Sequence, residues 1–144
     1  MSAPAKLIRL TAFLGDELED FPRYRGIDAR LYRVDRFKRR ELERWIETMI
    51  TACVDLAKAI LVLEGRALPY RYAALIMALE GVRGFSSPTL ERVSRWVRLR
   101  NLLAHEYLDL RWEGIKGFLQ QGEEDVRAYL AEVEAYLKRM EERL

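Results

Sequence analysis

Histidine and cysteine are nearly absent from this chain of 144 residues, which contains one of each. A structural zinc site draws four ligands mostly from these two residue types, so this chain alone does not offer one. One cysteine excludes an internal disulfide, and Cys53 stands in an apolar helical pattern that favours a buried thiol. We therefore expect neither a bound metal nor any other cofactor.

Long apolar runs are also missing. No uncharged stretch of about 18 residues is present, as a transmembrane helix would require, and the first residues lack the apolar core of a signal peptide. Glycine-rich phosphate loops and the Gly-x-Ser-x-Gly turn of serine hydrolases do not occur either. The chain is thus expected to be cytoplasmic, with no membrane contact.

What the sequence does contain is apolar spacing of three and four residues, with half of the residues hydrophobic and a third charged. Such spacing predicts amphipathic helices, and no alternation typical of strands interrupts it. Residues 1–144 are expected to form one all-α domain, an antiparallel up-and-down bundle of four main helices plus short ones. The expected helices span about 5–20, 32–63, 69–82, 88–105, 111–119 and 123–143.

The second of these helices is unusually long. At a rise of 1.5 Å per residue it would reach about 45 Å, and its apolar face is broad enough for burial on more than one side. A helix of this length exceeds what one chain of 144 residues readily covers, which suggests a partner subunit. Before the fourth helix, Ser87 is the expected N-cap and Pro88 the first helical residue.

Positive charge is concentrated in two stretches, although the net charge is only +2. Residues 23–44 hold nine basic and four acidic side chains, and a second group contains Arg92, Arg95, Arg98 and Arg100. Such stretches are compatible with a phosphate backbone, and equally with a solvated helix face or an acidic protein partner.

Arg100 lies within the apolar stripe of the fourth helix, which includes Leu90, Val93, Trp96, Val97, Leu103 and Ala104. The other three arginines of this helix fall elsewhere on the wheel and are expected to face solvent. Because a buried guanidinium is costly unless it is paired or faces a polar cleft, Arg100 requires either an internal carboxylate or a cleft.

His105 follows five residues later, a spacing that places two side chains about 140° apart on an unbroken helix. The two can converge only if the helix ends or distorts near Ala104. Asn101 and Tyr107 add an amide and a phenol to the same end. A histidine suits acid–base chemistry and an arginine suits a charged phosphoryl transition state, although a lone histidine at a helix C-terminus is also simply favourable to the helix dipole.

At these residues the chain resembles HepT-type proteins of the HEPN class, whose motif is Arg, four residues, His, one residue, Tyr. The polar Asn101 after Arg100 also fits. The resemblance covers roughly residues 30–140, in particular 43–60, 70–104 and 109–119, whereas the first thirty residues show little of it. Glu106 adds a negative charge beside a site meant for RNA.

The resemblance implies a HEPN-like domain that forms a homodimer, with an arginine and a histidine from each subunit in one cleft. It implies metal-independent RNA cleavage by attack of a 2′-hydroxyl on the adjacent phosphate. In that role His105 would be the acid–base group, Arg100 the phosphate binder, and Asn101 would position substrate. The implied partner is a nucleotidyltransferase antitoxin of the MNT type, which would attach AMP to Tyr107.

Two other functions stay open at this stage. The chain could be a non-catalytic helical module that docks a nucleotidyltransferase, which would bind its partner tightly without cutting RNA. Alternatively it could be a purely structural dimeric bundle in which Arg100 pairs with an internal carboxylate, and then Arg100→Met would be neutral or stabilising.

Overall fold

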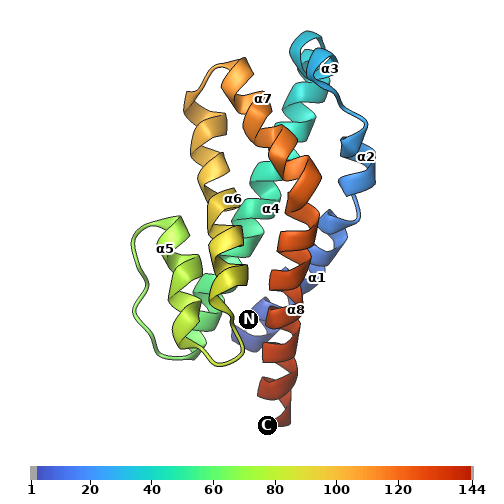
Figure 1. The fold of residues 1–144 in the computed structure, drawn as a ribbon. Helices are drawn as coiled ribbons and strands as arrows, with labels where there is room; N and C mark the ends of the chain where they lie inside the picture. The colour runs from blue at the N-terminus through green and yellow to red at the C-terminus, as the bar shows by residue number, and fades with distance from the viewer. Residues whose placement is uncertain (1–2, 144) are drawn as a thin grey trace.

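The computed structural model describes residues 3–143, and these form helices joined by short turns, without any strand (Figure 1). The main helices are α1 (Ala3–Leu18), α4 (Arg36–Leu63), α6 (Ser87–His105) and α8 (Glu123–Glu142). The shorter elements are α2 (Phe21–Arg25), α3 (Ala29–Val34), α5 (Tyr72–Met77), the 3₁₀ turn η1 (Ala78–Gly81), α7 (Leu108–Gly117) and the π turn η2 (Phe118–Gly122). The prediction of an all-α bundle is confirmed.

Helix α4 runs through the middle of the bundle and contacts α1, α3, α5 and α6, while α8 packs against α1 and α6 (Figure 1). The apolar positions of α4 repeat at three- and four-residue intervals and therefore lie on one buried face; they include Ile46, Met49, Ile50 and Ile60. Cys53 is buried among them, as predicted, and burial raises the pKa of its thiol to about 12. None of the helices within residues 3–143 combines the length and the apolar composition of a transmembrane segment.

The long helix expected over 32–63 is wrong in its first part, because the structure divides it into α3 and α4. Asp35 adopts an extended conformation, and its carboxylate accepts hydrogen bonds from the backbone N–H groups of Phe37 and Lys38, at 3.1 and 3.0 Å. This N-cap begins α4 at Arg36. Similarly, Ser86 rather than Ser87 precedes the first residue of α6.

Two expected helix breaks are also different. Pro22 does not end the first helix, because α1 stops at Leu18 and Pro22 lies in the first turn of α2, where its missing N–H is harmless. Gly122 does not interrupt the chain, because η2 joins α7 to α8. A Cβ atom at Gly122 would lie 2.6 Å from the ring of Phe118, so the glycine is needed for packing and not for a break.

Candidate functional site

Helix α6 presents one face to the core and one to the surface. Val93, Val97 and Leu103 are buried, whereas Asn101 and Ala104 are exposed and Arg100 is half-buried. Arg100 therefore lies at the edge of the predicted apolar stripe and not in its middle, and the stripe ends before Ala104. Leu99, which the pattern did not include, is buried.

The guanidinium of Arg100 lies against an aromatic ring. Its Cζ is 4.9 Å from the centroid of the Tyr72 ring, and Lys58 Nζ is 5.3 Å from the same centroid. Within residues 3–143, Arg100 makes no hydrogen bond or ion pair with another side chain. The cation–π contact holds the side chain in place without neutralising it.

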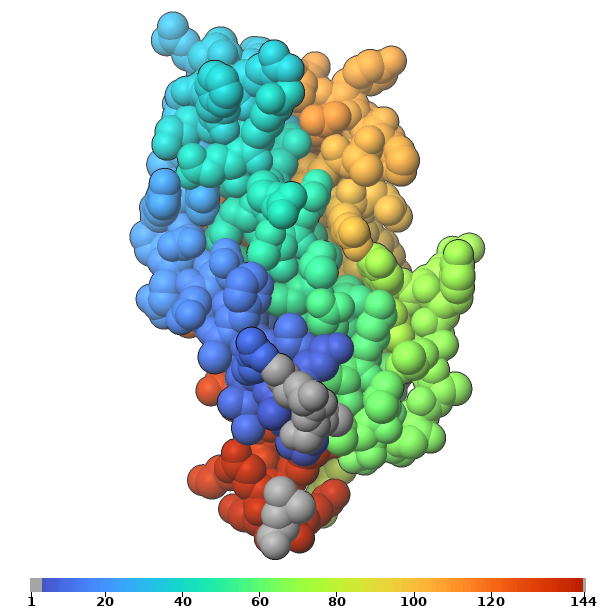
Figure 2. All heavy atoms as spheres, turned by 180° about the vertical axis from the view of Figure 1, so that it is seen from behind, coloured from blue at the N-terminus to red at the C-terminus, as the bar shows by residue number. Residues whose placement is uncertain are grey.

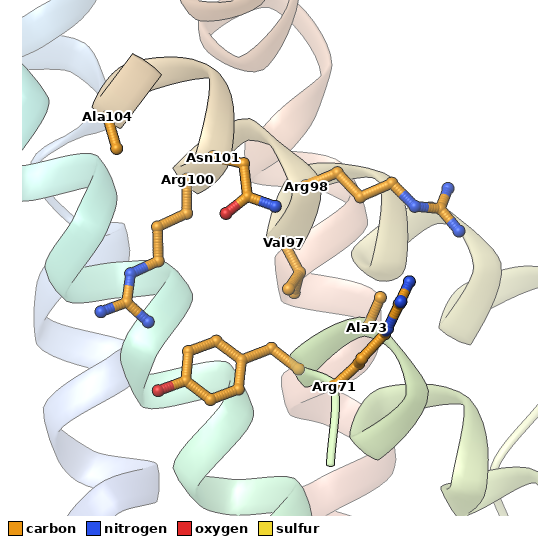
Figure 3. A pocket seen from close by; sticks show the side chains of 8 residues that line it. Arg71, Ala73, Val97, Arg98, Arg100, Asn101 and Ala104 are labelled. Atoms are coloured by element: carbon orange, nitrogen blue, oxygen red, sulfur yellow. The ribbon is translucent and has the colours of Figure 1, made fainter. Parts of the chain in front are cut away.

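A hollow of about 670 Å³ opens beside Arg100, between the start of α5 and the second half of α6 (Figure 3). We call it the arginine hollow; its lining residues are Arg71, Tyr72, Ala73, Val97, Arg98, Arg100, Asn101 and Ala104. In Figure 2 the outline of the molecule is notched between the green start of α5 and the orange end of α6. Three arginines and no carboxylate line this hollow, so its surface is positive.

A second hollow of about 360 Å³ lies on the other side of Arg100, towards α1 and α4. Its lining is mixed in charge, because Glu47 and Asp55 face it together with Arg44 and Arg100. Leu10 and Phe13 of α1 add apolar surface to it. Arg100 thus separates a positive hollow from a nearly neutral one.

The predicted site residues are only partly brought together within one chain. Asn101 and Arg100 both line the arginine hollow, whereas His105 and Tyr107 line neither hollow. Helix α6 ends at His105, as predicted, so Arg100 and His105 belong to one continuous helix. Regular geometry then separates the two side chains by about 140°, so within one chain they do not line a common hollow, and their convergence on a groove shared by two subunits stays a prediction.

The turn after His105 is held by a network that the sequence did not reveal. Arg111 Nε donates to the backbone carbonyl of Glu106 at 2.7 Å, and its Nη1 lies 3.4 and 3.5 Å from the two Glu43 carboxylate oxygens. The hydroxyl of Tyr32 donates to the same carboxylate, and burial raises the pKa of this phenol, which keeps its proton. No spacing rule links Arg111 to Glu43, because the two residues are 68 positions apart along the chain.

Tyr107 follows this turn and is the N-cap residue of α7. Its side chain is 87% exposed, and within residues 3–143 no hydrogen bond engages its hydroxyl. His105 is also exposed. Both side chains are consequently open to a partner or a substrate from outside the chain.

Much of the basic stretch at residues 23–44 has structural roles. Arg25 pairs with Glu123, Arg23 pairs with Glu41 at 3.3 Å, and Arg39 Nη1 donates to the backbone carbonyl of Tyr32. On α6, Arg95 and Arg98 are exposed as predicted. Arg92 differs, because it is half-buried.

Arg92 Nε lies 3.9 Å from the buried carboxylate of Asp125, which also accepts a hydrogen bond of 2.7 Å from the indole of Trp96.

No group of three histidine, cysteine, aspartate or glutamate side chains in the described part of the chain could hold a metal ion. For a reaction without a metal, the candidate groups are the imidazole of His105 and the guanidinium of Arg100.

Comparisons with known proteins agree on one class. A family model described as "Ribonuclease HepT-like" matches residues 14–133. A solved structure of a tri-AMPylated HEPN toxin from Shewanella oneidensis, in complex with MNT antitoxin, has a TM-score of 0.78 at 18% identity, covering 94% of this chain and 99% of that one.

A second solved structure, of a toxin–antitoxin with AMP-PNP, has a TM-score of 0.77 at 18% identity, with 90% of this chain and 97% of that one covered. No curated protein matches. At this level of identity the solved structures establish the shared fold alone, while the family model covers most of the chain.

Proposed function

This chain belongs to the HepT-like ribonuclease family, and from that membership we propose that it is the toxin of a toxin–antitoxin pair, an endoribonuclease that needs no metal. The observation that carries the proposal is the state of Arg100. This arginine of the family motif has no carboxylate partner and borders a hollow that also lacks one. Within residues 3–143, no ion pair ties Arg100 to the fold, and the carboxylates of Glu47 and Asp55 line only the second hollow.

The proposed reaction is transesterification within RNA. The 2′-oxygen attacks the adjacent phosphorus, the bond from phosphorus to the 5′-oxygen breaks, and a 2′,3′-cyclic phosphate and a 5′-hydroxyl result. His105 accepts the proton of the 2′-hydroxyl, and a histidine returns a proton to the leaving 5′-oxygen. Arg100 stabilises the extra negative charge on the phosphorane-like transition state, and Asn101 positions the substrate.

A homodimer is part of the proposal because one chain does not bring these groups together. The two motif side chains diverge along α6, so a cleft containing both requires a second copy that contributes its own pair. Exposed apolar side chains on α1 and α5 support such contact; Ile8, Phe13 and Tyr72 are 47%, 41% and 41% exposed. A two-fold axis beside α6 would also enclose the second hollow.

Control by an MNT-type nucleotidyltransferase antitoxin is the final part of the proposal. The exposure of Tyr107 supports its modification, because the phenol oxygen is accessible to a nucleotide held by another protein. The oxygen would attack the α-phosphorus of ATP, form a Tyr–O–P bond and release pyrophosphate. The added negative charge, two residues from His105, would repel RNA from the cleft.

The experiment is a cleavage assay with purified protein and a defined single-stranded RNA in EDTA, comparing the native chain with His105→Ala. We expect the native protein to cut and to leave cyclic phosphate ends, and the variant to lose about a hundredfold or more in rate. Equal cleavage by the variant would place the activity elsewhere. No cleavage by either, with tight binding of a nucleotidyltransferase, would favour the docking-module alternative.

A further inference from the structure

The arginine hollow gathers three arginines and no carboxylate around one space. Arg71 and Arg98 are exposed on its rim, Arg100 is half-buried in it, and none of the three makes an ion pair within residues 3–143. Elsewhere, Arg25, Arg92, Arg111 and Arg127 all lie against carboxylates. Three like charges around one hollow repel one another unless an anion joins them.

The three arginines come from two elements that meet at the hollow. Arg71 is the N-cap residue of α5, whereas Arg98 and Arg100 belong to α6. In Figure 3 the side chains of Arg71 and Arg98 extend towards the same side of the hollow, while that of Arg100 extends towards the opposite side. There its guanidinium lies over the ring of Tyr72. The proposed function assigns Arg100 to the cleaved phosphate, which leaves the other two for phosphates further along the same strand.

We propose that Arg71 and Arg98 form a subsite for the backbone phosphates of single-stranded RNA next to the cleaved bond. This proposal rests on the proposed function, since RNA is the ligand in both. A volume of about 670 Å³ accommodates a nucleotide-sized group. Arginine forks bind phosphate oxygens in pairs, and binding of this kind tolerates any base sequence.

The second hollow supports this assignment by contrast. It borders the same Arg100 but holds two carboxylates, Glu47 and Asp55, which would repel a phosphate backbone. A strand that places one phosphate on Arg100 is therefore drawn towards the arginine hollow and away from α4. The direction of the RNA across α6 follows from this difference in charge.

The test is binding without cleavage, measured by fluorescence anisotropy with a labelled single-stranded oligoribonucleotide over a series of KCl concentrations. All proteins carry His105→Ala so that the RNA stays intact. Arg71→Gln and Arg98→Gln should each weaken binding about fivefold near 0.1 M salt and lower the slope of log affinity against log salt by about 0.7. Circular dichroism verifies that these exposed substitutions leave the fold intact.

Arg83→Gln is the matched control, because Arg83 is an exposed arginine near the opposite end of α5, outside the arginine hollow. It should change neither affinity nor slope. Unchanged binding by the Arg71 and Arg98 variants would overturn the proposal, and so would an equal loss in the Arg83 variant. Tighter binding of poly-glutamate or of ATP than of the RNA at the same salt would also overturn it.

The two proposals fail in different ways. If the native chain binds RNA through Arg71 and Arg98 but does not cut it, the ribonuclease assignment fails and the subsite stands. If the native chain cuts RNA but the Arg71 and Arg98 substitutions leave its affinity for RNA unchanged, the subsite fails and the ribonuclease assignment stands.

Discussion

Two arginines near the motif differ in their partners within the chain. Arg111 donates to the Glu106 carbonyl and lies against the Glu43 carboxylate, with its side chain 26% exposed. Arg100, on the preceding helix, lies against the ring of Tyr72 and makes no ion pair within residues 3–143, although Glu47 and Asp55 line the second hollow that it borders. The first charge is neutralised within the chain and fixes a turn, whereas the second remains available for a ligand.

The arrangement around Arg111 has a parallel elsewhere in the bundle. Arg25 Nε donates to the backbone carbonyl of Leu119 at 3.1 Å, and its Nη2 pairs with Glu123. In both places one guanidinium joins a carbonyl to a carboxylate and so ties α7 or η2 to another helix. Pairing of this kind identifies arginines that serve the fold, whereas Arg100 is half-buried and makes no such pair within residues 3–143.

The largest expected effect comes from Arg100→Met. We expect RNA cleavage to fall by roughly 10²- to 10³-fold, because the transition-state charge loses its stabilising group. The free energy of unfolding should drop by no more than about 1 kcal/mol, the scale of a cation–π contact. Cleavage kinetics and urea denaturation of the same preparation measure both, and a loss of several kcal/mol would show that Arg100 serves the fold after all.

Arg111→Met should give the reverse result. It leaves the Glu43 carboxylate, whose side chain is 15% exposed, without its cation, and we expect unfolding to become easier by about 2 kcal/mol. Cleavage should fall less than in the Arg100 variant. A double-mutant cycle with Glu43→Gln gives the coupling energy, and additive losses would contradict the pairing.

The sequence predicted the helices well because each buries an apolar stripe that the spacing displays. Its errors lie where a side chain makes a local hydrogen bond, as Asp35 does in starting α4, or where a glycine gives room to a ring, as Gly122 does for Phe118. Neither the cap nor the glycine changes the spacing of apolar residues, so the spacing could not predict where α4 begins or why the chain stays helical at Gly122.

The candidate site was less predictable from the sequence. The motif drew attention to Arg100, Asn101, His105 and Tyr107, and the roles of these residues remain predictions. The sequence named Arg98 only as one of four arginines in a basic stretch and did not point to Arg71, because exposed arginines are common and only the folded chain shows which of them border one hollow. Which arginines lie beside one another depends on tertiary packing, and the spacing along the sequence does not display it.

A smaller effect is expected from Tyr129→Phe, which calibrates the cost of removing a paired polar group away from the motif. The Tyr129 hydroxyl donates to the backbone carbonyl of Cys53 at 2.8 Å, and both residues are buried. Loss of this bond should cost about 1 kcal/mol of unfolding free energy and leave cleavage unchanged. Thermal denaturation and the RNA assay check the two parts, and reduced cleavage would mean that the core and the motif are coupled.

The smallest effect concerns the pair formed by Arg25 and Glu123. Burial raises the pKa of Glu123, but hydrogen bonds from Arg25 and Arg127 outweigh it and leave the pKa below its usual value. A lowered pKa in the folded state stabilises the fold above the unfolded-state pKa, and the contribution disappears as the pH falls through the folded-state value. Glu123→Gln should therefore cost about 0.5 kcal/mol near neutral pH, since both arginines are partly exposed, and nothing in strong acid. Urea denaturation at several pH values measures the difference between native and variant, and a difference that does not shrink in acid would mean that Glu123 acts through its shape and not through its charge.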